Sequence, residues 1–183
     1  MKKILSTIII FVTVALTTSC SNISFNDRYI NASWNKIIIA PFDGNNADIA
    51  EEEFEHALAV SSQINIVPAS LVLLKLKETS LIEKYKAAPT KTIIELARIM
   101  KADGVIFAKV ESYSPESRRH SELTSTSASI YARLIDVNDM SVVLTSQQQS
   151  SSIFSNSSSV IKDVSLNAID EFQEGFIQLN GSE

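Results

Sequence analysis

The chain has 183 residues, with 16 Lys and Arg against 21 Asp and Glu and a formal net charge of −5. This acidic balance argues against a nucleic acid or an anionic lipid surface as its main partner. Cys20 is the only cysteine, so no internal disulfide can form, and the length is sufficient for one domain with an apolar core.

The first 19 residues carry the three parts of a secretory signal peptide. Lys2 and Lys3 form a short basic start, a nearly continuous apolar run reaches Leu16, and small residues follow as far as Ser19. A stable membrane-spanning helix needs about 20 apolar residues, and this run is well short of that length. The sequence therefore predicts a cleaved signal peptide over residues 1–19 rather than a permanent span.

Cys20 stands directly after the small residues of this signal. The arrangement resembles the bacterial lipobox, in which the cysteine is acylated, palmitate being one such acyl group, and becomes the first mature residue. Thr17 occupies the place where the lipobox usually has Leu, and Leu16 precedes it. The resemblance implies a lipid on Cys20, and Ser21, which is not Asp, implies sorting to the outer membrane, periplasmic side. The alternative is an ordinary secretory signal with a chance cysteine.

Residues 22–33 are polar and irregular, which predicts a short linker, so that residues 20–33 comprise the cysteine that the lipobox resemblance implies to be lipidated and this linker. About 13 extended residues reach roughly 40 Å at 3.3 Å each, so the folded part must stay near its membrane. We expect one periplasmic domain over residues 34–179 and a C-terminal tail over residues 180–183.

The first half of the predicted domain alternates strands with helices. Consecutive isoleucines at 37–39 indicate a strand buried on both faces, and Pro41 marks its end. Asp48 opens a helix in which Phe54 and Leu58 repeat at helical spacing. The predicted elements are a strand at 35–42, this helix from residue 48, a strand at 63–67, a helix at 69–77, a less regular connector at 80–90 and a helix at 92–101.

The second half consists of three strands and a final helix. Residues 125–134 alternate apolar side chains such as Ile130 with polar ones such as Arg133, which indicates an antiparallel strand with one buried face. The predicted elements are strands at 105–113, 123–136 and 141–149, polar loops at 114–122 and 150–159, and a helix at 159–179.

This order, β-α-β-α-α-β-β-β-α, predicts an α/β fold with a single mixed, mostly antiparallel sheet packed by helices. The first two strands should be parallel, because a right-handed helical crossover joins them. The last three strands should form an antiparallel meander.

Three strand motifs resemble those of one family of envelope proteins. Residues 36–42 (KIIIAPF) are similar to its opening I-V-x-P-F strand, and residues 102–110 (ADGVIFAKV) to its G-A-D-x-V-I-x-G-x-V element. Residues 132–143 resemble its L-x-L-I-D-x-x-T-G-x-V-V hairpin, with Met140 or Ser141 in the place of the family glycine. The family includes CsgG, PelC, LpoB and the N-terminal domain of TolB.

The resemblance implies a non-enzymatic lipoprotein that supports export or assembly of a surface polymer or appendage. Its partner would be a second copy of the chain, in a homo-oligomer, or an outer-membrane export protein. The alternative is a regulator or activator of an envelope enzyme such as a peptidoglycan synthase. A curli-type channel needs membrane-spanning hairpins and a synthase activator needs a long linker, whereas a PelC-like ring needs neither.

No residue pattern indicates catalysis, a cofactor or a metal. His56 and His120 have neither a cysteine partner nor metal-ligand spacing. The acidic loop at 43–48 lacks the Glu that an EF-hand needs at its twelfth position, where Phe54 stands. The acidic cluster at 51–55 is interpreted as a solvated helix face.

Two places are candidate contact sites. Trp34, the only tryptophan, either packs in the core or contacts the membrane or a neighbouring subunit. Arg118, Arg119 and His120 form either a solvated loop tip or a partner contact.

Overall fold

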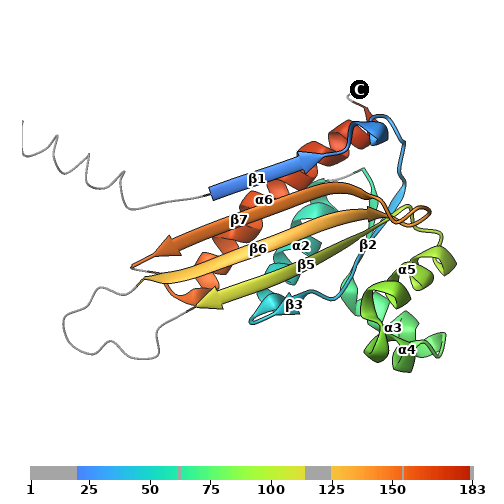
Figure 1. Cartoon of the computed structure of the whole chain (residues 1–183), viewed down its shortest axis with the longest axis horizontal. Helices are drawn as coiled ribbons and strands as arrows, with labels where there is room; N and C mark the ends of the chain where they lie inside the picture. Colours follow the sequence, from blue (N-terminus) through green and yellow to red (C-terminus); the bar gives the residue numbers. More distant parts are fainter. Residues whose placement is uncertain (1–19, 62, 114–124, 154, 182–183) are drawn as a thin grey trace, which may run out of the picture.

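The computed structural model describes residues 20–61, 63–113, 125–153 and 155–181. They form one α/β domain on a seven-stranded mixed sheet, in the order β1-β7-β6-β5-β2-β4, with β3 paired to β5 (Figure 1). The strands are β1 (Cys20–Phe25), β2 (Lys36–Ile39), β3 (Asp43–Gly44), β4 (Asn65–Val67), β5 (Gly104–Tyr113), β6 (Thr126–Asp136) and β7 (Val142–Ser152). The helices are the 3-10 helix η1 (Asp27–Tyr29), α2 (Ala47–Ser61), α3 (Ala69–Glu78), α4 (Ile82–Ala87), α5 (Pro89–Ile99) and α6 (Ser157–Asn180).

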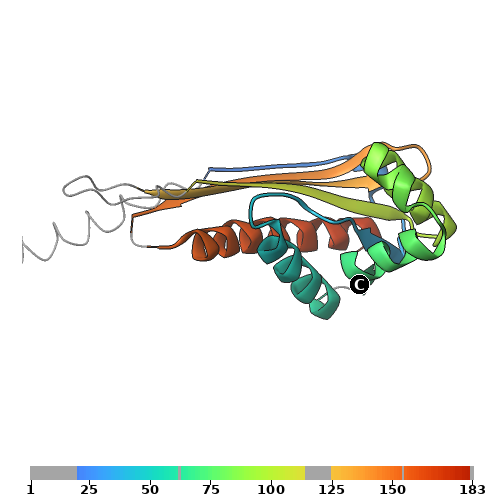
Figure 2. The same ribbon diagram turned by 90° about the horizontal axis from the view of Figure 1, so that it is seen from below.

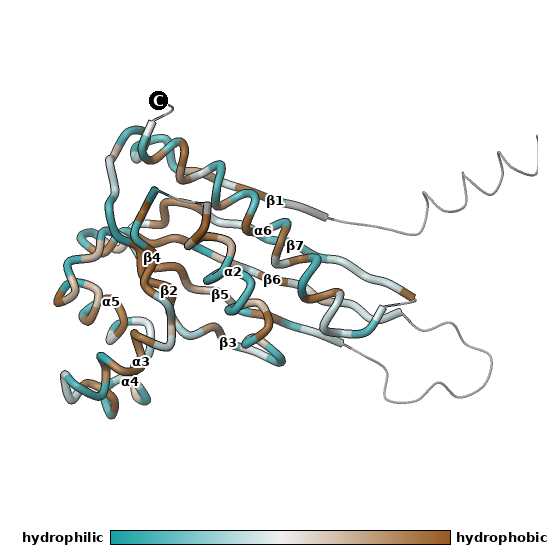
Figure 3. Tube along the Cα trace, turned by 180° about the vertical axis from the view of Figure 1, so that it is seen from behind, coloured by the Kyte–Doolittle hydropathy of each residue, from teal (hydrophilic) through white to brown (hydrophobic). Residues whose placement is uncertain are grey.

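The helices cover the sheet unequally. α6 and α2 lie along one face of the long strands, whereas α3, α4 and α5 gather at one end of the sheet (Figure 2). Apolar and polar residues alternate along α6 (Figure 3), and its apolar side chains enter the larger core cluster. In that cluster the rings of Phe54 and Phe172 meet edge to face, with centroids 5.6 Å apart. A second cluster, around Ile38 and Ile93, joins the sheet to α3 and α5.

Strand directions confirm the predicted mixed sheet. β2 is parallel to β4 and β5, and the β5-β6-β7 meander is antiparallel. On β2, Ile37 and Ile39 belong to the larger core and Ile38 to the second, so this strand is buried on both faces as predicted. On β6, Ile130 is fully buried and Tyr131 is 44% exposed, which confirms a strand with one buried face.

The segment predicted to be a linker is part of the domain, so the predicted boundary at residue 34 is wrong. β1 pairs antiparallel with β7, from Cys20 opposite Gln149 to Phe25 opposite Leu144. Phe25 packs against the larger core. Serine and asparagine make up half of β1, and apolar alternation is limited to Ile23 and Phe25, so its strand conformation depends on pairing with a β7 that is distant along the chain.

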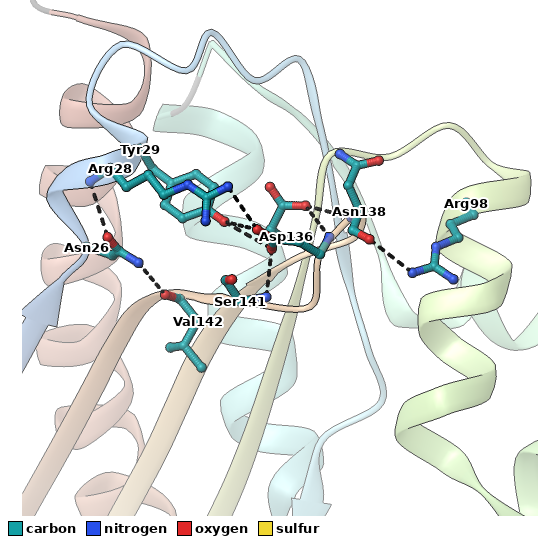
Figure 4. A network of polar contacts seen from close by, with 9 residues as sticks. Asn26, Arg28, Tyr29, Arg98, Asp136, Asn138, Ser141 and Val142 are labelled. Carbon is teal, nitrogen blue, oxygen red and sulfur yellow. Dashed lines mark hydrogen bonds and ion pairs between the residues drawn. The ribbon is translucent and has the colours of Figure 1, made fainter.

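A polar network fastens the residues after β1 to the turn between β6 and β7 (Figure 4). The Asn26 backbone N–H donates to the Val143 carbonyl at 2.8 Å, and its side chain donates to the Val142 carbonyl at 3.3 Å. The Tyr29 hydroxyl donates to Asp139 Oδ1 at 3.2 Å. These bonds hold the predicted linker at the end of the sheet opposite to Cys20.

The turn itself is held from both sides. The Ser141 backbone N–H donates to Asp139 Oδ1 at 2.9 Å, and this bond is the main reason that the pKa of the Asp139 carboxyl is lowered. From α5, Arg98 Nε donates to the Val137 carbonyl at 3.0 Å. Met140 adopts a φ of 63°, the left-handed region that favours glycine, so the non-glycine turn keeps a glycine-like conformation.

The chain next caps the C-terminus of α6. The backbone N–H groups of Asn31 and Ser33 donate to the carbonyls of Gln178 and Leu179, both at 2.9 Å. They satisfy two of the acceptors that the last turn of a helix leaves free. The N-terminal segment therefore binds the turn between β6 and β7 and also the end of α6.

Several element boundaries differ from the predicted ones. The connector at 80–90 contains α4, a helix of six residues in which no side chain is fully buried, so its apolar pattern is short. β7 continues into the serine-rich stretch as far as Ser152. α6 begins at Ser157, where Asn156 accepts the Ser159 N–H at 2.9 Å as N-cap, and it ends at Asn180 rather than at the predicted residue 179.

Candidate interaction surface

The described helices leave most of one face of β5, β6 and β7 open, on the side opposite α6 (Figure 2). Strand register places exposed residues in rows across it, because Lys109 is opposite Tyr131 and Tyr131 is opposite Gln147. A second row contains Phe107 and Arg133. We call this surface the open face and define it by Phe107, Lys109, Glu111, Tyr131, Arg133 and Gln147.

A groove of ≈ 530 Å³ borders the open face where β5 and β6 approach α4 and α5. Phe107, Tyr131 and Arg133 line it from the strands, and Tyr85 and Ile93 line it from the helices. Its volume lies within the range of about 300–1,000 Å³ that is usual for ligand pockets. The groove is therefore large enough to receive the side chains of a partner.

Charged and aromatic groups are combined on this surface. The Arg133 guanidinium lies 5.8 Å from the centroid of the Phe107 ring, which is cation–π distance. Lys109 Nζ donates to Glu111 Oε1 at 2.7 Å, and this hydrogen bond raises the pKa of Lys109 and lowers the pKa of Glu111. Burial raises the pKa of the Tyr85 hydroxyl.

This arrangement is suited to contact with a partner. Tyr and Arg are enriched in protein interfaces because they join apolar area to polar groups. Among the described residues, His, Cys, Asp and Glu form no group that could hold a metal ion. His56 is exposed on α2, and His120 lies outside the described residues.

Cys20 is the first residue of β1 and is opposite Gln149 on β7. The same row crosses the sheet through Ser129 to Glu111, near the end where β5 finishes and β6 begins. Residues 1–19 lie outside the described part of the chain, so the signal peptide and the lipid on Cys20 stay predictions. Within the described residues, no helix has the length and apolar character to cross a membrane.

Trp34 lies in the core and not at a contact surface. Its side chain is 7% exposed, and its ring meets Tyr29 edge to face with centroids 5.9 Å apart. It also covers Gly104, where an added Cβ would lie 2.3 Å from the Trp34 ring. The side chain is therefore packed in the core, which leaves little of it for contact with a membrane or a neighbouring subunit. The predicted contact at residues 118–120 lies outside the described residues.

Two acidic residues of α2 have structural roles that the sequence did not reveal. The Glu51 carboxylate accepts the Phe42 backbone N–H at 2.8 Å, although burial raises its pKa. The Glu55 carboxylate accepts the Ala69 N–H at 2.6 Å, at the start of α3, where Pro68 offers no side-chain cap. The cluster is therefore only partly a solvated face. Contacts that span 9 and 14 residues leave no periodic signal.

No family model and no curated protein matches this sequence. Solved structures do resemble the fold. A dodecamer of a PelC variant from Paraburkholderia phytofirmans matches with a TM-score of 0.57 and 17% identity, over 86% of this chain and 99% of that chain. The lipoprotein GNA1162 from Neisseria meningitidis matches with a TM-score of 0.51 and 17% identity, over 76% and 99%. The LpoB C-terminal domain from Salmonella enterica matches with a TM-score of 0.45 and 13% identity, over 64% and 83%.

The likeness to PelC and to GNA1162 concerns the fold, since identity is far below the level that indicates shared function. It supports part of the predicted resemblance, while the resemblance to CsgG and to TolB stays a prediction. The chain therefore has an α/β fold that is shared with a PelC dodecamer and with the lipoprotein GNA1162.

Proposed function

We propose that this chain is a non-enzymatic outer-membrane lipoprotein, anchored through Cys20 with its domain on the periplasmic side. The observation that supports this most is the position of Cys20 as the first residue of the edge strand β1. In the described part of the chain, the strand β1 then starts directly at the proposed cleavage point. Each buried CH₂ contributes about 0.8 kcal/mol, so several acyl chains would give effectively permanent anchoring.

This placement shortens the tether that the sequence predicted. A linker of about 13 residues would have reached roughly 40 Å. With β1 paired to β7 from Cys20 onward, the lipid joins the sheet itself. The end of the sheet that contains Cys20 and Gln149 would lie against the membrane, and any partner must come close to that membrane.

We further propose that the domain supports export or assembly of a surface polymer or appendage, as a homo-oligomer or beside an outer-membrane export protein. The open face, with Tyr131 and Arg133, supports a role in binding another protein. The fold shared with a PelC dodecamer supports an oligomer. Activation of a peptidoglycan synthase is the less favoured role, because a domain without a linker cannot extend toward a distant enzyme.

Replacement of the lipidated residue tests the anchor. Cys20→Ser should move the chain from the membrane fraction to the soluble periplasm, abolish palmitate labelling and leave the circular dichroism spectrum unchanged. Ser21→Ala is the matched control, and it should remain anchored and labelled. A Cys20→Ser chain that stays in the membrane fraction would show that the lipoprotein proposal is wrong.

Deletion of the gene tests the role. We expect loss of a surface polymer or appendage, restored by the wild-type chain and not by Cys20→Ser. If every surface polymer and appendage is intact after deletion, the export role is refuted. Recovery of a peptidoglycan synthase with the purified chain would favour the activator role instead.

A further inference from the structure

The outer side of α6 carries an acidic and apolar stripe. Asp163, Leu166, Asp170, Glu174 and Ile177 recur at spacings of three and four residues, on the side opposite the buried face. All five are exposed, and Leu166 and Ile177 keep 46% and 58% of their surface in contact with solvent. We call these five residues the α6 stripe. Within the described residues, none of its three carboxylates forms an ion pair.

The open face lies on the other side of the same sheet and is complementary in chemistry. It holds two cations, Lys109 and Arg133, and the exposed ring of Tyr131. Lys109 is already paired with Glu111. Arg133 stacks on Phe107 and has no carboxylate partner among the residues that the structure describes. An acidic surface brought to this face would supply that partner.

The two surfaces also match in length. α6 has 24 residues, which span about 36 Å at 1.5 Å per residue. β6 and β7 have 11 residues each, which span roughly 36 Å at 3.3 Å per residue. A helix of this length already lies along these strands on the covered face (Figure 2), so a second helix can lie along the open face.

We propose that the α6 stripe of one copy docks on the open face of the next copy. In this contact Asp170 meets Arg133, and Leu166 or Ile177 enters the groove beside Tyr131. The inference rests on the homo-oligomer part of the proposed function and names its surfaces. Because the two surfaces lie on opposite sides of one domain, the contact is heterologous, and repeated copies form a ring or a filament rather than a closed dimer.

Cysteine cross-linking tests this contact, because the chain has only one native cysteine. The full-length chain carrying Tyr131→Cys and Asp170→Cys is purified in detergent and oxidised with copper phenanthroline. We expect a ladder of dimers, trimers and higher species. Each single variant should give no species beyond a dimer, because the proposed lipid blocks the sulfur of Cys20. The two positions lie on opposite sides of the sheet, so a bond within one copy cannot form.

A control pair measures random collision. Tyr131→Cys with Glu52→Cys places the second cysteine on α2, which is also exposed but outside the α6 stripe. This pair should give no ladder above that of the single variants. An equal ladder from the control pair, or no ladder from Tyr131→Cys with Asp170→Cys, refutes the contact.

Charge exchange gives an independent measurement. Arg133→Glu should weaken association about tenfold or more, since close charge pairs across interfaces couple by about 1.5–7 kcal/mol. Arg133→Glu with Asp170→Arg should recover most of the loss, measured as oligomer mass by light scattering over a concentration series. An oligomer without the cross-links refutes this interface alone. A monomer at all concentrations refutes both the interface and the proposed homo-oligomer, while membrane anchoring is tested separately by fractionation.

Discussion

Substitution of Tyr29 tests whether the N-terminal segment is a linker or part of the domain. Its side chain is 6% exposed, its ring packs edge to face against Trp34, and its hydroxyl donates to Asp139 at 3.2 Å. Truncation of a buried aromatic ring to Ala usually costs about 3–5 kcal/mol. We expect Tyr29→Ala to lower the free energy of unfolding by about 3 kcal/mol. A residue in a free linker would change it by less than about 0.5 kcal/mol.

The hydroxyl and the ring can be separated by a second variant. Tyr29→Phe removes only the hydroxyl, with its bonds to the side chains of Asp139 and Ser141, and loss of one such bond costs about 0.5–1.5 kcal/mol. Because the Asp139 side chain is 36% exposed, water can replace the lost donor, and we expect the lower end of that range. The difference between Tyr29→Ala and Tyr29→Phe then gives the contribution of the ring.

Urea unfolding followed by tryptophan fluorescence is the direct assay. Trp34 is the only tryptophan and touches the Tyr29 ring, so its emission reports on this part of the core. With a slope of about 2 kcal/mol/M, a loss of 3 kcal/mol moves the midpoint down by about 1.5 M. Ile30→Ala is the matched control, since Ile30 is the next residue and 51% exposed. A Tyr29→Ala midpoint equal to that of Ile30→Ala would refute the reasoning and restore the linker.

Three further outcomes follow from named contacts. Glu55→Gln should cost about 1 kcal/mol in urea unfolding, because the charge at the start of α3 is lost while an amide oxygen can still accept the Ala69 N–H; no change would show that the charge is unimportant there. Gly44→Ala should cost about 2 kcal/mol or more, since φ is 114° and the new Cβ would lie 1.8 Å from the Val110 carbonyl oxygen; a neutral effect in thermal unfolding would contradict the pairing of β3 with β5. The pKa of Asp139 is lowered, chiefly by the Ser141 backbone N–H, so its contribution to stability is present above pH 3.8 and is lost as pH falls through the folded-state pKa. The urea midpoint of the wild-type chain should therefore decrease below about pH 4, and it should decrease less in Asp139→Asn. An equal decrease in both chains would show that other carboxyl groups cause it.

The sequence predicts only part of the open face. Alternation along β6 predicts that Tyr131 and Arg133 share a face, because successive strand residues point to opposite sides. That no helix would cover this face over most of its length could not be predicted, since it depends on how the helices distribute over the sheet. The groove also requires α4, a six-residue helix with no fully buried side chain, which is too short to give a clear apolar pattern.

Local pattern by itself determined most of the elements. The consecutive isoleucines of β2, the alternation of β6 and the helical spacing of α6 each identify an element, because burial of one face imposes a period on the sequence. The parallel and antiparallel directions followed from the order of these elements. The position of Cys20 after a run of small residues likewise indicated attachment to a membrane.

Only the tertiary structure decided what happens between Cys20 and Trp34. The polar residues of β1 carry no regular period, and they become a strand because β7 supplies the backbone partners that an edge strand needs. Asn26 and Tyr29 then bind a turn more than a hundred residues away along the chain. Such long-range pairings leave no local signal. The predicted tether is therefore folded protein, and a lipid on Cys20 would be attached directly to the edge of the sheet.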